Sequence, residues 1–274
     1  MYWDIKKDTE GGFDFSNYER NKSLNTNLKH KYKKTGTTIV GTIFKDGVVL
    51  GADTRATEDT IAADLDCEKL HYLAPNIYCA GAGTAADNDM ITRLVSSELE
   101  LQRLYTGSES RISHVESRLT KHLFRYQGHI GAALIIGGVD IKGPQLVNIS
   151  PYGNSMRLPF TTMGSGSLAA MAILETKYKD NMTKDECVEL VKDAIEAGIF
   201  NDLGSGSNVD IFVITREGVE KKESYRCYNK KVFTQADTNA YKFNKGTTEI
   251  IEEVSKKWKD ITIEKVEDNK MQLD

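Results

Sequence analysis

The order of expected strands and helices is the feature of this sequence that most constrains its fold. Two apolar segments, residues 38–44 and 48–53, flank Lys45-Asp46-Gly47, and Asp-Gly between apolar runs predicts a tight β-hairpin. Further along, helices are expected in pairs and strands in hairpin-linked groups. That order excludes a sheet built from alternating βαβ units. It favours an α+β fold in which two antiparallel sheets pack face to face, with pairs of helices outside.

Hydrophobic periodicity assigns most of the remaining segments. Apolar residues at helical spacing predict a first pair of helices over residues 85–105 and 110–127. A second pair is expected over residues 167–178 and 183–200, where Thr183 and Glu186 form a capping box. Short apolar runs predict strands at residues 70–73, 76–81, 130–139, 145–149, 209–215 and 223–228.

Composition narrows the class of protein. A chain of 274 residues with 39% hydrophobic residues can bury a core that needs neither disulfides nor a metal. Its net charge of −4, without a long basic stripe, argues against a nucleic-acid partner. No apolar run is long enough to span a membrane, and the N-terminus lacks a secretory signal.

The cysteines and histidines predict no metal site and no cofactor. The cysteines form no CxxC pair, and the five histidines show no paired spacing. This usage fits reduced thiols in a protein of the cytosol or nucleus. The cysteines are Cys67, Cys79, Cys187 and Cys227.

The junction between Gly36 and Thr37 reads as a cleavage site in front of a nucleophile. The first 36 residues carry eight Lys or Arg and five Asp or Glu, a net charge of +3, and show no apolar periodicity. They are expected to form a detachable segment. Cleavage before Thr37 would free an α-amine, with a pKa of about 7.7–8.0, that could take the proton of the threonine hydroxyl. The alternative is that Thr37 and Thr38 simply open a threonine-rich strand.

Three further segments could contribute to such a site, and each has a plain structural alternative. Asp53 and Arg55 end the second strand, as solvated turn residues would, and Lys69 lies beside the following strand. Small residues at 80–84 close a strand and open a helix, where N–H groups bind anions or where chains simply pack closely. Asp202 follows a helix end that a glycine alone would explain.

A glycine-rich segment at residues 164–169 matches the GxGxxA form of the dinucleotide-binding fingerprint. A Rossmann unit would next require a parallel strand. Here a second helix is expected first, and the next strand begins near Asn208. The sequence therefore argues against nucleotide binding.

Together these segments resemble the catalytic beta subunits of the proteasome, which are N-terminal nucleophile hydrolases. The resemblance covers nearly the whole chain and implies a four-layer αββα sandwich. It is carried by Lys69 and by residues 35–41, 51–57, 80–83, 164–167 and 202–207.

The resemblance implies a role for each matched residue. Thr37 would attack the peptide carbonyl, Lys69 would favour its alkoxide, and Asp53 would pair with Lys69. The N–H group of Gly83 would face the oxyanion. The groups expected to hydrogen-bond around the Thr37 amine are Ser165, Asp202 and Ser205.

Within this family the trypsin-like type fits best, because residues 11–17 and 20–21 of the leader also match it. Gly81 would leave the specificity pocket wide, and Asp89 would attract a long cationic side chain. Alternatively, Asp89 is a solvated acid in the first turn of a helix. The matched pocket residues are Ala56, Cys67, His71, Gly81 and Asp89, with Glu58 and Asp64 nearby.

The resemblance also implies how substrate binds and how the chain is organised. A peptide would add as a strand along Thr57 and along the segment from Gly83 to Ala85, bonded mainly through its backbone. Residues 1–36 would be a propeptide, 37–245 the catalytic domain and 246–274 a tail that contacts a neighbouring subunit, with a strand-like run at 260–266.

The expected partners are other proteasome alpha and beta subunits in stacked rings and unfolded polypeptide substrates, and assembly chaperones are possible. The expected location is the cytoplasm and nucleus. Two alternatives stay open at this point. One is a non-catalytic scaffold subunit of the same particle. The other is an amidohydrolase of the wider class that acts on small amides and is active as an isolated chain. The leader and the pocket residues, which match one subunit type together, disfavour both.

Overall fold

A computed structural model of the chain describes residues 16–23, 35–58 and 61–227. By its internal contacts the chain divides into Met1–Lys230 and Lys231–Asp274. The expected tail at 246–274, including the strand-like run at 260–266, lies outside the described residues, as does most of the leader. The domain borders expected from the sequence therefore stay predictions.

The first sheet is antiparallel and contains the predicted hairpin. Its strands are β1 (Ile39–Phe44), β2 (Gly47–Asp53), β10 (Phe160–Met163), β11 (Asn208–Thr215) and β12 (Val219–Cys227). They lie in the order β10-β1-β2-β11-β12. Phe44 pairs with Gly47, so Lys45 and Asp46 form the two-residue turn between β1 and β2. Both strands are buried almost throughout, which explains their continuous apolar runs.

The second sheet is also antiparallel and follows the predicted runs closely. Its strands are β5 (Leu70–Ala74), β6 (Ile77–Gly83), β7 (Ala132–Asp140), β8 (Gly143–Ile149) and β9 (Ser155–Arg157), which lie in this order. Leu70 pairs with Ala80, and the N–H group of Gly81 donates to the carbonyl oxygen of Lys69 at 2.9 Å. This pairing holds Lys69, which directly precedes β5, beside the carboxyl end of β6.

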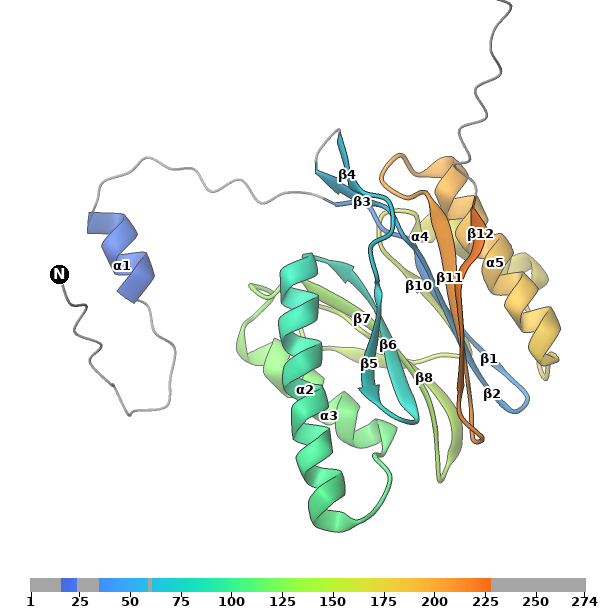
Figure 1. The fold of residues 1–274 in the computed structure, drawn as a ribbon, viewed down its shortest axis with the longest axis horizontal. Helices are drawn as coiled ribbons and strands as arrows, with labels where there is room; N and C mark the ends of the chain where they lie inside the picture. The colour runs from blue at the N-terminus through green and yellow to red at the C-terminus, as the bar shows by residue number, and fades with distance from the viewer. Residues whose placement is uncertain (1–15, 24–34, 59–60, 228–274) are drawn as a thin grey trace, which may run out of the picture. The chain divides into compact units, whose positions relative to one another are not determined.

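The two pairs of helices cover the outer faces of the two sheets (Figure 1). Helices α2 (Ala85–Thr106) and α3 (Ile112–Arg125) pack on the second sheet, and α4 (Ser167–Lys177) and α5 (Lys184–Asn201) pack on the first. A third apolar cluster, which includes Leu50, Ile135 and Phe212, lies between the sheets. The fold is thus a four-layer αββα sandwich, as predicted. The predicted capping box at Thr183 and Glu186 is also confirmed.

Several short elements were not anticipated from the sequence. Strands β3 (Ala56–Glu58) and β4 (Ile61–Asp64) form a small two-stranded sheet of their own. Strands β9 and β10 follow each other closely, yet each pairs into a different sheet. β12 begins four residues before the predicted strand at 223–228. Within the leader, helix α1 (Ser16–Ser23) is formed by polar residues.

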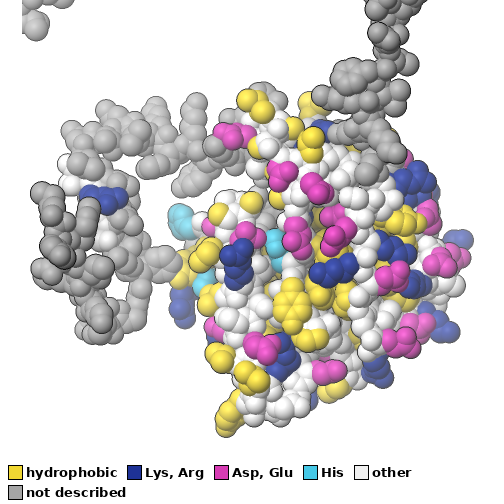
Figure 2. Space-filling view, viewed as in Figure 1, with side chains coloured by type: hydrophobic (Ala, Val, Ile, Leu, Met, Phe, Trp, Pro, Cys, Tyr) yellow, Lys and Arg dark blue, Asp and Glu magenta, His cyan; other side chains and the backbone are white. Residues whose placement is uncertain are grey.

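The surface carries charges of both signs. Figure 2 shows Lys and Arg side chains interspersed with Asp and Glu, with apolar side chains between them. Among the described residues, large exposed apolar side chains recur along α2, at Met90, Leu101, Leu104 and Tyr105. None of the described helices has a stretch apolar enough, over sufficient length, to cross a membrane.

Candidate active site

Thr37 lies two residues before the start of β1, and its hydroxyl is aimed at the peptide group that precedes it. The Thr37 side chain is buried, and its Oγ1 donates to the carbonyl oxygen of Gly36 at 2.7 Å. Lys69 Nζ donates to the same Oγ1 at 3.2 Å and approaches the Gly36 oxygen at 3.4 Å. A hydroxyl, a cation and a carbonyl group therefore meet at the Gly36–Thr37 junction.

The β1–β2 hairpin supplies the partner of that cation. Its register sets Asp53, the last residue of β2, beside Thr38, whose N–H group donates to Asp53 Oδ1 at 2.8 Å. Lys69 Nζ donates to the same oxygen at 2.8 Å, and the N–H group of Gly206 donates to Oδ2 at 3.1 Å. Burial raises the pKa of Asp53, and these three donors offset part of the rise. Asp53 thus fixes both the lysine and the start of β1.

A second hydrogen-bond network surrounds the Thr37 nitrogen. Ser165 and Ser205 both donate to Asp202 Oδ2, at 2.6 and 2.7 Å. Burial alone would raise the pKa of Asp202, but these bonds and one from the N–H group of Gly204 hold it below its ordinary value. Because the single proton of Ser165 points to Asp202, its oxygen is free to accept from Thr37 N, at 3.0 Å.

Glycines bring these segments into close contact. A Cβ atom on Gly166 would overlap the Thr38 hydroxyl, and one on Gly164 would overlap the Thr37 carbonyl oxygen. The GxGxxA segment therefore wraps the start of β1. Gly36 faces Gly204 in the same way, since a Cβ on Gly36 would overlap the Gly204 backbone. These contacts leave no room for a Cβ atom on Gly36, Gly164 or Gly166.

The two residues before Thr37 occupy the path expected for a substrate. The N–H group of Gly36 donates to Thr57 Oγ1 at 3.0 Å, and Thr35 Oγ1 donates to the carbonyl oxygen of Gly83 at 3.2 Å. The expected path between Thr57 and Gly83 is thus occupied, but both bonds involve side-chain hydroxyls rather than a backbone ladder. Gly83 has a φ of +102°, and a Cβ there would overlap the Gly131 carbonyl oxygen, so only glycine fits.

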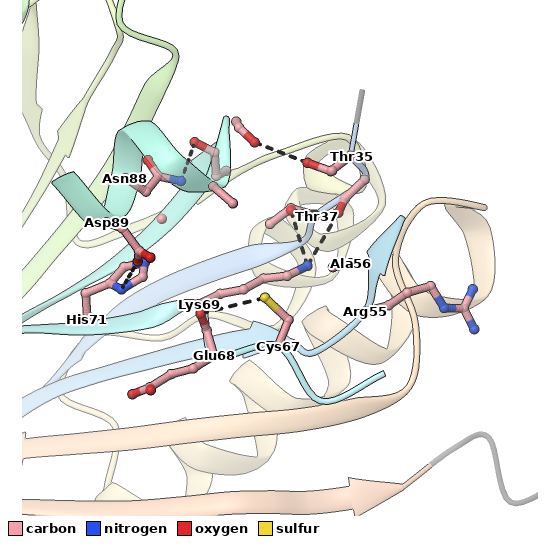
Figure 3. A pocket seen from close by; sticks show the side chains of 15 residues that line it. Thr35, Thr37, Arg55, Ala56, Cys67, Glu68, Lys69, His71, Asn88 and Asp89 are labelled. Atoms are coloured by element: carbon pink, nitrogen blue, oxygen red, sulfur yellow. Dashed lines mark hydrogen bonds and ion pairs between the residues drawn. The ribbon is translucent and has the colours of Figure 1, made fainter. Parts of the chain in front are cut away.

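A pocket with a volume of about 100 Å³ opens beside Thr37 and Lys69 (Figure 3). Gly81 lies in its wall, and a Cβ atom there would come within 3.0 Å of the Asn88 side chain and 3.1 Å of His71 Nε2, so any larger residue would narrow the space. Six of the expected binding residues line the pocket: Ala56, Cys67, His71, Gly81, Ala85 and Asp89.

Three other expected binding residues lie outside this pocket. Thr57 contacts the leader through its hydroxyl instead of lining the cavity. Glu58 and Asp64 lie in the small β3–β4 sheet, where both are exposed. Asp64 accepts from the N–H group of Asp66 at 3.0 Å. Burial is the main cause that raises the pKa of the Cys67 thiol, and the negative charge of Asp64 adds to the rise. Glu58 and Asp64 were expected near the pocket, but neither residue lines it.

Asp89 lies at the end of the pocket away from Thr37, next to His71. Its Oδ1 is 3.7 Å from His71 Nδ1. The acid in the first turn of α2 is Asp87, which accepts from the N–H group of Gly131 at 2.8 Å. The Asp89 side chain is half exposed and lies just beyond that turn, so the alternative of a solvated acid near the start of the helix stays open beside the pocket role.

A comparison with known families identifies this arrangement. The model for the family described as "Proteasome subunit" matches residues 33–214, well over half of the chain. The chain belongs to the proteasome subunit family. It is 55% identical over 245 residues to proteasome subunit beta type-7 of Dictyostelium discoideum, covering 89% of this chain and 91% of that protein.

Two further relatives agree with this assignment. Proteasome subunit beta type-7-B of Arabidopsis thaliana is 55% identical over 248 residues, 90% of each chain. Proteasome subunit beta type-10 of Mus musculus is 49% identical over 246 residues, covering 88% of this chain and 89% of that protein. All three relatives are beta subunits, so the chain is a member of the beta branch of the proteasome family.

In the structure of this beta subunit, two residues without an expected role hold part of the site. Arg55 Nη1 donates to the Ser205 carbonyl oxygen at 3.3 Å, its guanidinium turned away from the pocket (Figure 3). Thr38 Oγ1 hydrogen-bonds Ser205 Oγ at 2.7 Å. Both residues thereby hold the loop that carries Ser205. In the sequence, the feature that pointed to these two residues was their position, since each lies within two residues of an expected catalytic residue.

The subunit also has pocket residues that sequence analysis missed. Glu68 and Asn88 line the cavity, each directly next to a residue that was expected there. Asn88 is buried, and its Nδ2 donates to the Ala82 carbonyl oxygen at 3.2 Å. Among the described residues, no group of three His, Cys, Asp or Glu side chains is arranged to hold a metal ion.

Proposed function

We propose that this chain is the precursor of a catalytic, trypsin-like beta subunit of the proteasome core particle. Its reaction is the hydrolysis of peptide bonds, with Thr37 as nucleophile and with cleavage preferred after Lys or Arg. The observation that carries the proposal is the Thr37 hydroxyl, which lies against the Gly36 carbonyl group with Lys69 and Asp53 behind it. The other residues in this environment orient or stabilise that hydroxyl.

The first reaction is cleavage of the chain at Gly36–Thr37. Thr37 Oγ1 attacks the carbonyl carbon of Gly36, and the hydroxyl proton passes to the Thr37 nitrogen as the C–N bond breaks. Gly36 is then held as an ester on Oγ1. Water hydrolyses the ester, which releases the leader with a carboxyl group and leaves Thr37 with a free amine and a free hydroxyl.

Substrate hydrolysis repeats this chemistry with the amine as base. The Thr37 amine takes the hydroxyl proton, and the alkoxide forms beside the Lys69 ammonium, which stabilises it. Ser165 is 3.0 Å from the Thr37 nitrogen and, with Asp202 and Ser205 behind it, keeps the amine oriented. Gly83 lies next to the scissile segment and would donate its N–H group to the oxyanion. Loss of such a donor lowers the rate by roughly 10²–10³.

The pocket supports a preference for basic residues before the cleaved bond. Gly81 adds no side chain to the pocket wall, and Asp89 places a carboxylate at the far end. A long cationic side chain complements both features. A short or apolar side chain would leave the carboxylate without a partner.

The proposal also covers partners and location. The subunit would assemble with other proteasome alpha and beta subunits and would act on unfolded polypeptides in the cytoplasm and nucleus. The exposed apolar side chains along α2 support burial against neighbouring chains. Assembly chaperones are possible further partners.

The test compares purified core particles that carry wild-type, Thr37→Ala or Thr37→Ser chains as their sole copy. Peptides with Arg before the cleaved bond should be hydrolysed by wild type and, more slowly, by Thr37→Ser. Thr37→Ala particles should assemble but lose this activity by at least about 10³-fold, because no nucleophile remains. Unchanged hydrolysis in Thr37→Ala particles would contradict the proposal and favour a non-catalytic scaffold subunit.

A further inference from the structure

The pocket carboxylate of Asp89 already faces a cation of its own chain. Arg93 lies one turn further along α2, and its Nη2 is 3.9 Å from Asp89 Oδ2. Residues four apart on a helix lie on the same side of it, so the helix itself holds Arg93 next to Asp89. The Arg93 side chain is 80% exposed, which leaves the guanidinium room to move over the carboxylate.

The other neighbour of Asp89 does not carry a permanent charge. The His71 ring is 15% exposed, and its pKa is lowered, first by burial and further by the charge of Arg93, against the opposing effect of Asp89 and Glu68. His71 is therefore neutral near pH 7. Among the described residues, Arg93 is then the side chain that lies within ion-pair distance of Asp89 and is positively charged at pH 7.

Arg93 lies just beyond the end of the specificity pocket. A second, open hollow of about 610 Å³ shares Glu68, His71 and Asp89 with that pocket and contains Arg93 in its wall. The remaining wall of this hollow is polar and is formed by Tyr72, Thr92, Ser96, Ser97 and Glu100. A long basic side chain that reaches Asp89 from the Thr37 side therefore meets the guanidinium of Arg93 on the opposite side.

We propose that Arg93 is a specificity-determining residue that weakens the binding of basic side chains in the pocket by competing for Asp89. The proposal rests on the trypsin-like function proposed above. Two cations that share one carboxylate repel each other, so each basic substrate must displace Arg93 or bind beside it. A neutral side chain has no such conflict. Arg93 thus narrows the difference in affinity between basic and apolar residues.

The test uses core particles in which Arg93→Gln or Arg118→Gln replaces the wild-type chain. Arg118 is a matched control, because it pairs with Glu98 away from the pocket. Arg93→Gln should lower KM for peptides with Arg or Lys before the cleaved bond by about two- to fivefold, the scale of a solvent-screened ion pair. KM for matched Leu peptides and kcat for both should stay at wild-type values. The decrease of KM for basic peptides should become smaller as the salt concentration rises.

A double variant separates this competition from a change of shape. In an Asp89→Asn background, Arg93→Gln should lower KM for basic peptides much less than it does when Asp89 is present, because the shared carboxylate is gone and only screened repulsion between the two cations remains. The same decrease in that background, an equal effect on Leu peptides, or a wild-type KM in Arg93→Gln would overturn the role of Arg93 while leaving the protease function intact. If wild-type particles fail to cleave basic peptides but lose another activity with Thr37→Ala, the trypsin-like assignment itself fails.

Discussion

At the scale of single residues, the close contact at the Gly36–Thr37 junction depends on glycines that carry no side chain. Gly36 and Gly204 approach so closely that neither position has room for a Cβ. This approach keeps the Gly36 carbonyl group against the Thr37 hydroxyl and within reach of Lys69. Even a methyl group on Gly36 or Gly204 would therefore disturb the position of the Gly36 carbonyl group.

A Gly36→Ala substitution should slow cleavage before Thr37. The added methyl group must push the chain away from Gly204, at a cost of about 1–3 kcal/mol, which corresponds to a roughly five- to 150-fold lower rate. The measurement is the accumulation of uncleaved chain, followed by intact mass. Thr35→Ala is the control, since it removes only the hydroxyl bond to Gly83 and should have a smaller effect. Cleavage of Gly36→Ala at the wild-type rate would show that the chain does not react in this geometry.

His71 gives the pocket a pH dependence whose sign follows from its lowered pKa. Burial is the main cause of the lowering, so the ring is neutral at pH 7 and gains a proton only below the ordinary value of about 6.5. Its charge would then compete with a basic substrate for Asp89. KM for Arg peptides should accordingly rise as pH falls through this range, whereas KM for Leu peptides should not.

The matched variant for this prediction is His71→Asn, which cannot gain the charge. Its KM for Arg peptides should stay flat over the same pH range. An identical acid-side rise in His71→Asn particles would assign the effect to another group.

At the scale of elements, the sequence predicted the long strands and helices because each carries its own pattern. The β1–β2 hairpin is encoded by Asp46-Gly47 between apolar runs, and both helix pairs by their apolar spacing. The short strands lack such a pattern. Strand β10 has four residues and exists through its pairing with β1, which is distant in sequence. Strands β3, β4 and β9 are equally short.

The same distinction separates the parts of the site. Thr37, Asp53 and Lys69 stand at the ends of predicted strands, and a known family pattern led to their expected roles. The contacts of Arg55 and Thr38 with Ser205 join segments about 150 residues apart, and nothing local encodes them. The family pattern placed Glu58 and Asp64 near the pocket, but in the structure they belong to the small β3–β4 sheet, where both are exposed.

The capping box of α5 provides a prediction for an element that holds part of the site. Thr183 Oγ1 accepts from the N–H group of Glu186, while the Glu186 carboxylate accepts from Thr183 N at 2.9 Å. Thr183→Ala should lower the free energy of unfolding of the full-length chain by about 1 kcal/mol. Thr176→Ala, at an exposed position on α4, is the control and should have a much smaller effect. Chemical denaturation of both variants measures the difference.

The pH dependence of this box has a defined sign. Hydrogen bonds from Thr183 are the main cause that lowers the pKa of Glu186. The carboxylate therefore stabilises the fold above its unfolded pKa of about 4.3, and this contribution is lost as pH falls through the lower folded value. The difference in stability between wild type and Thr183→Ala should shrink over that acidic range. A constant difference would contradict a role for the ionised carboxylate.

At the scale of the whole molecule, the uncleaved chain occupies its own candidate active site. Thr35 and Gly36 lie between Thr57 and Gly83, where a substrate would otherwise bind. Gly36 has no side chain to place in the specificity pocket. Under the proposed function, self-cleavage and the later choice of substrate would use different parts of the same site, and residues 1–36 would block catalysis until they are removed.

The central claim is that removal of the leader at Gly36–Thr37 creates the nucleophile. The most direct measurement is the intact mass and N-terminal sequence of this chain in purified native core particles. The account predicts a chain that begins at Thr37 with a free amine. A chain that retains Gly36, or that is cut at any other bond, would leave Thr37 without its amine and would contradict the account.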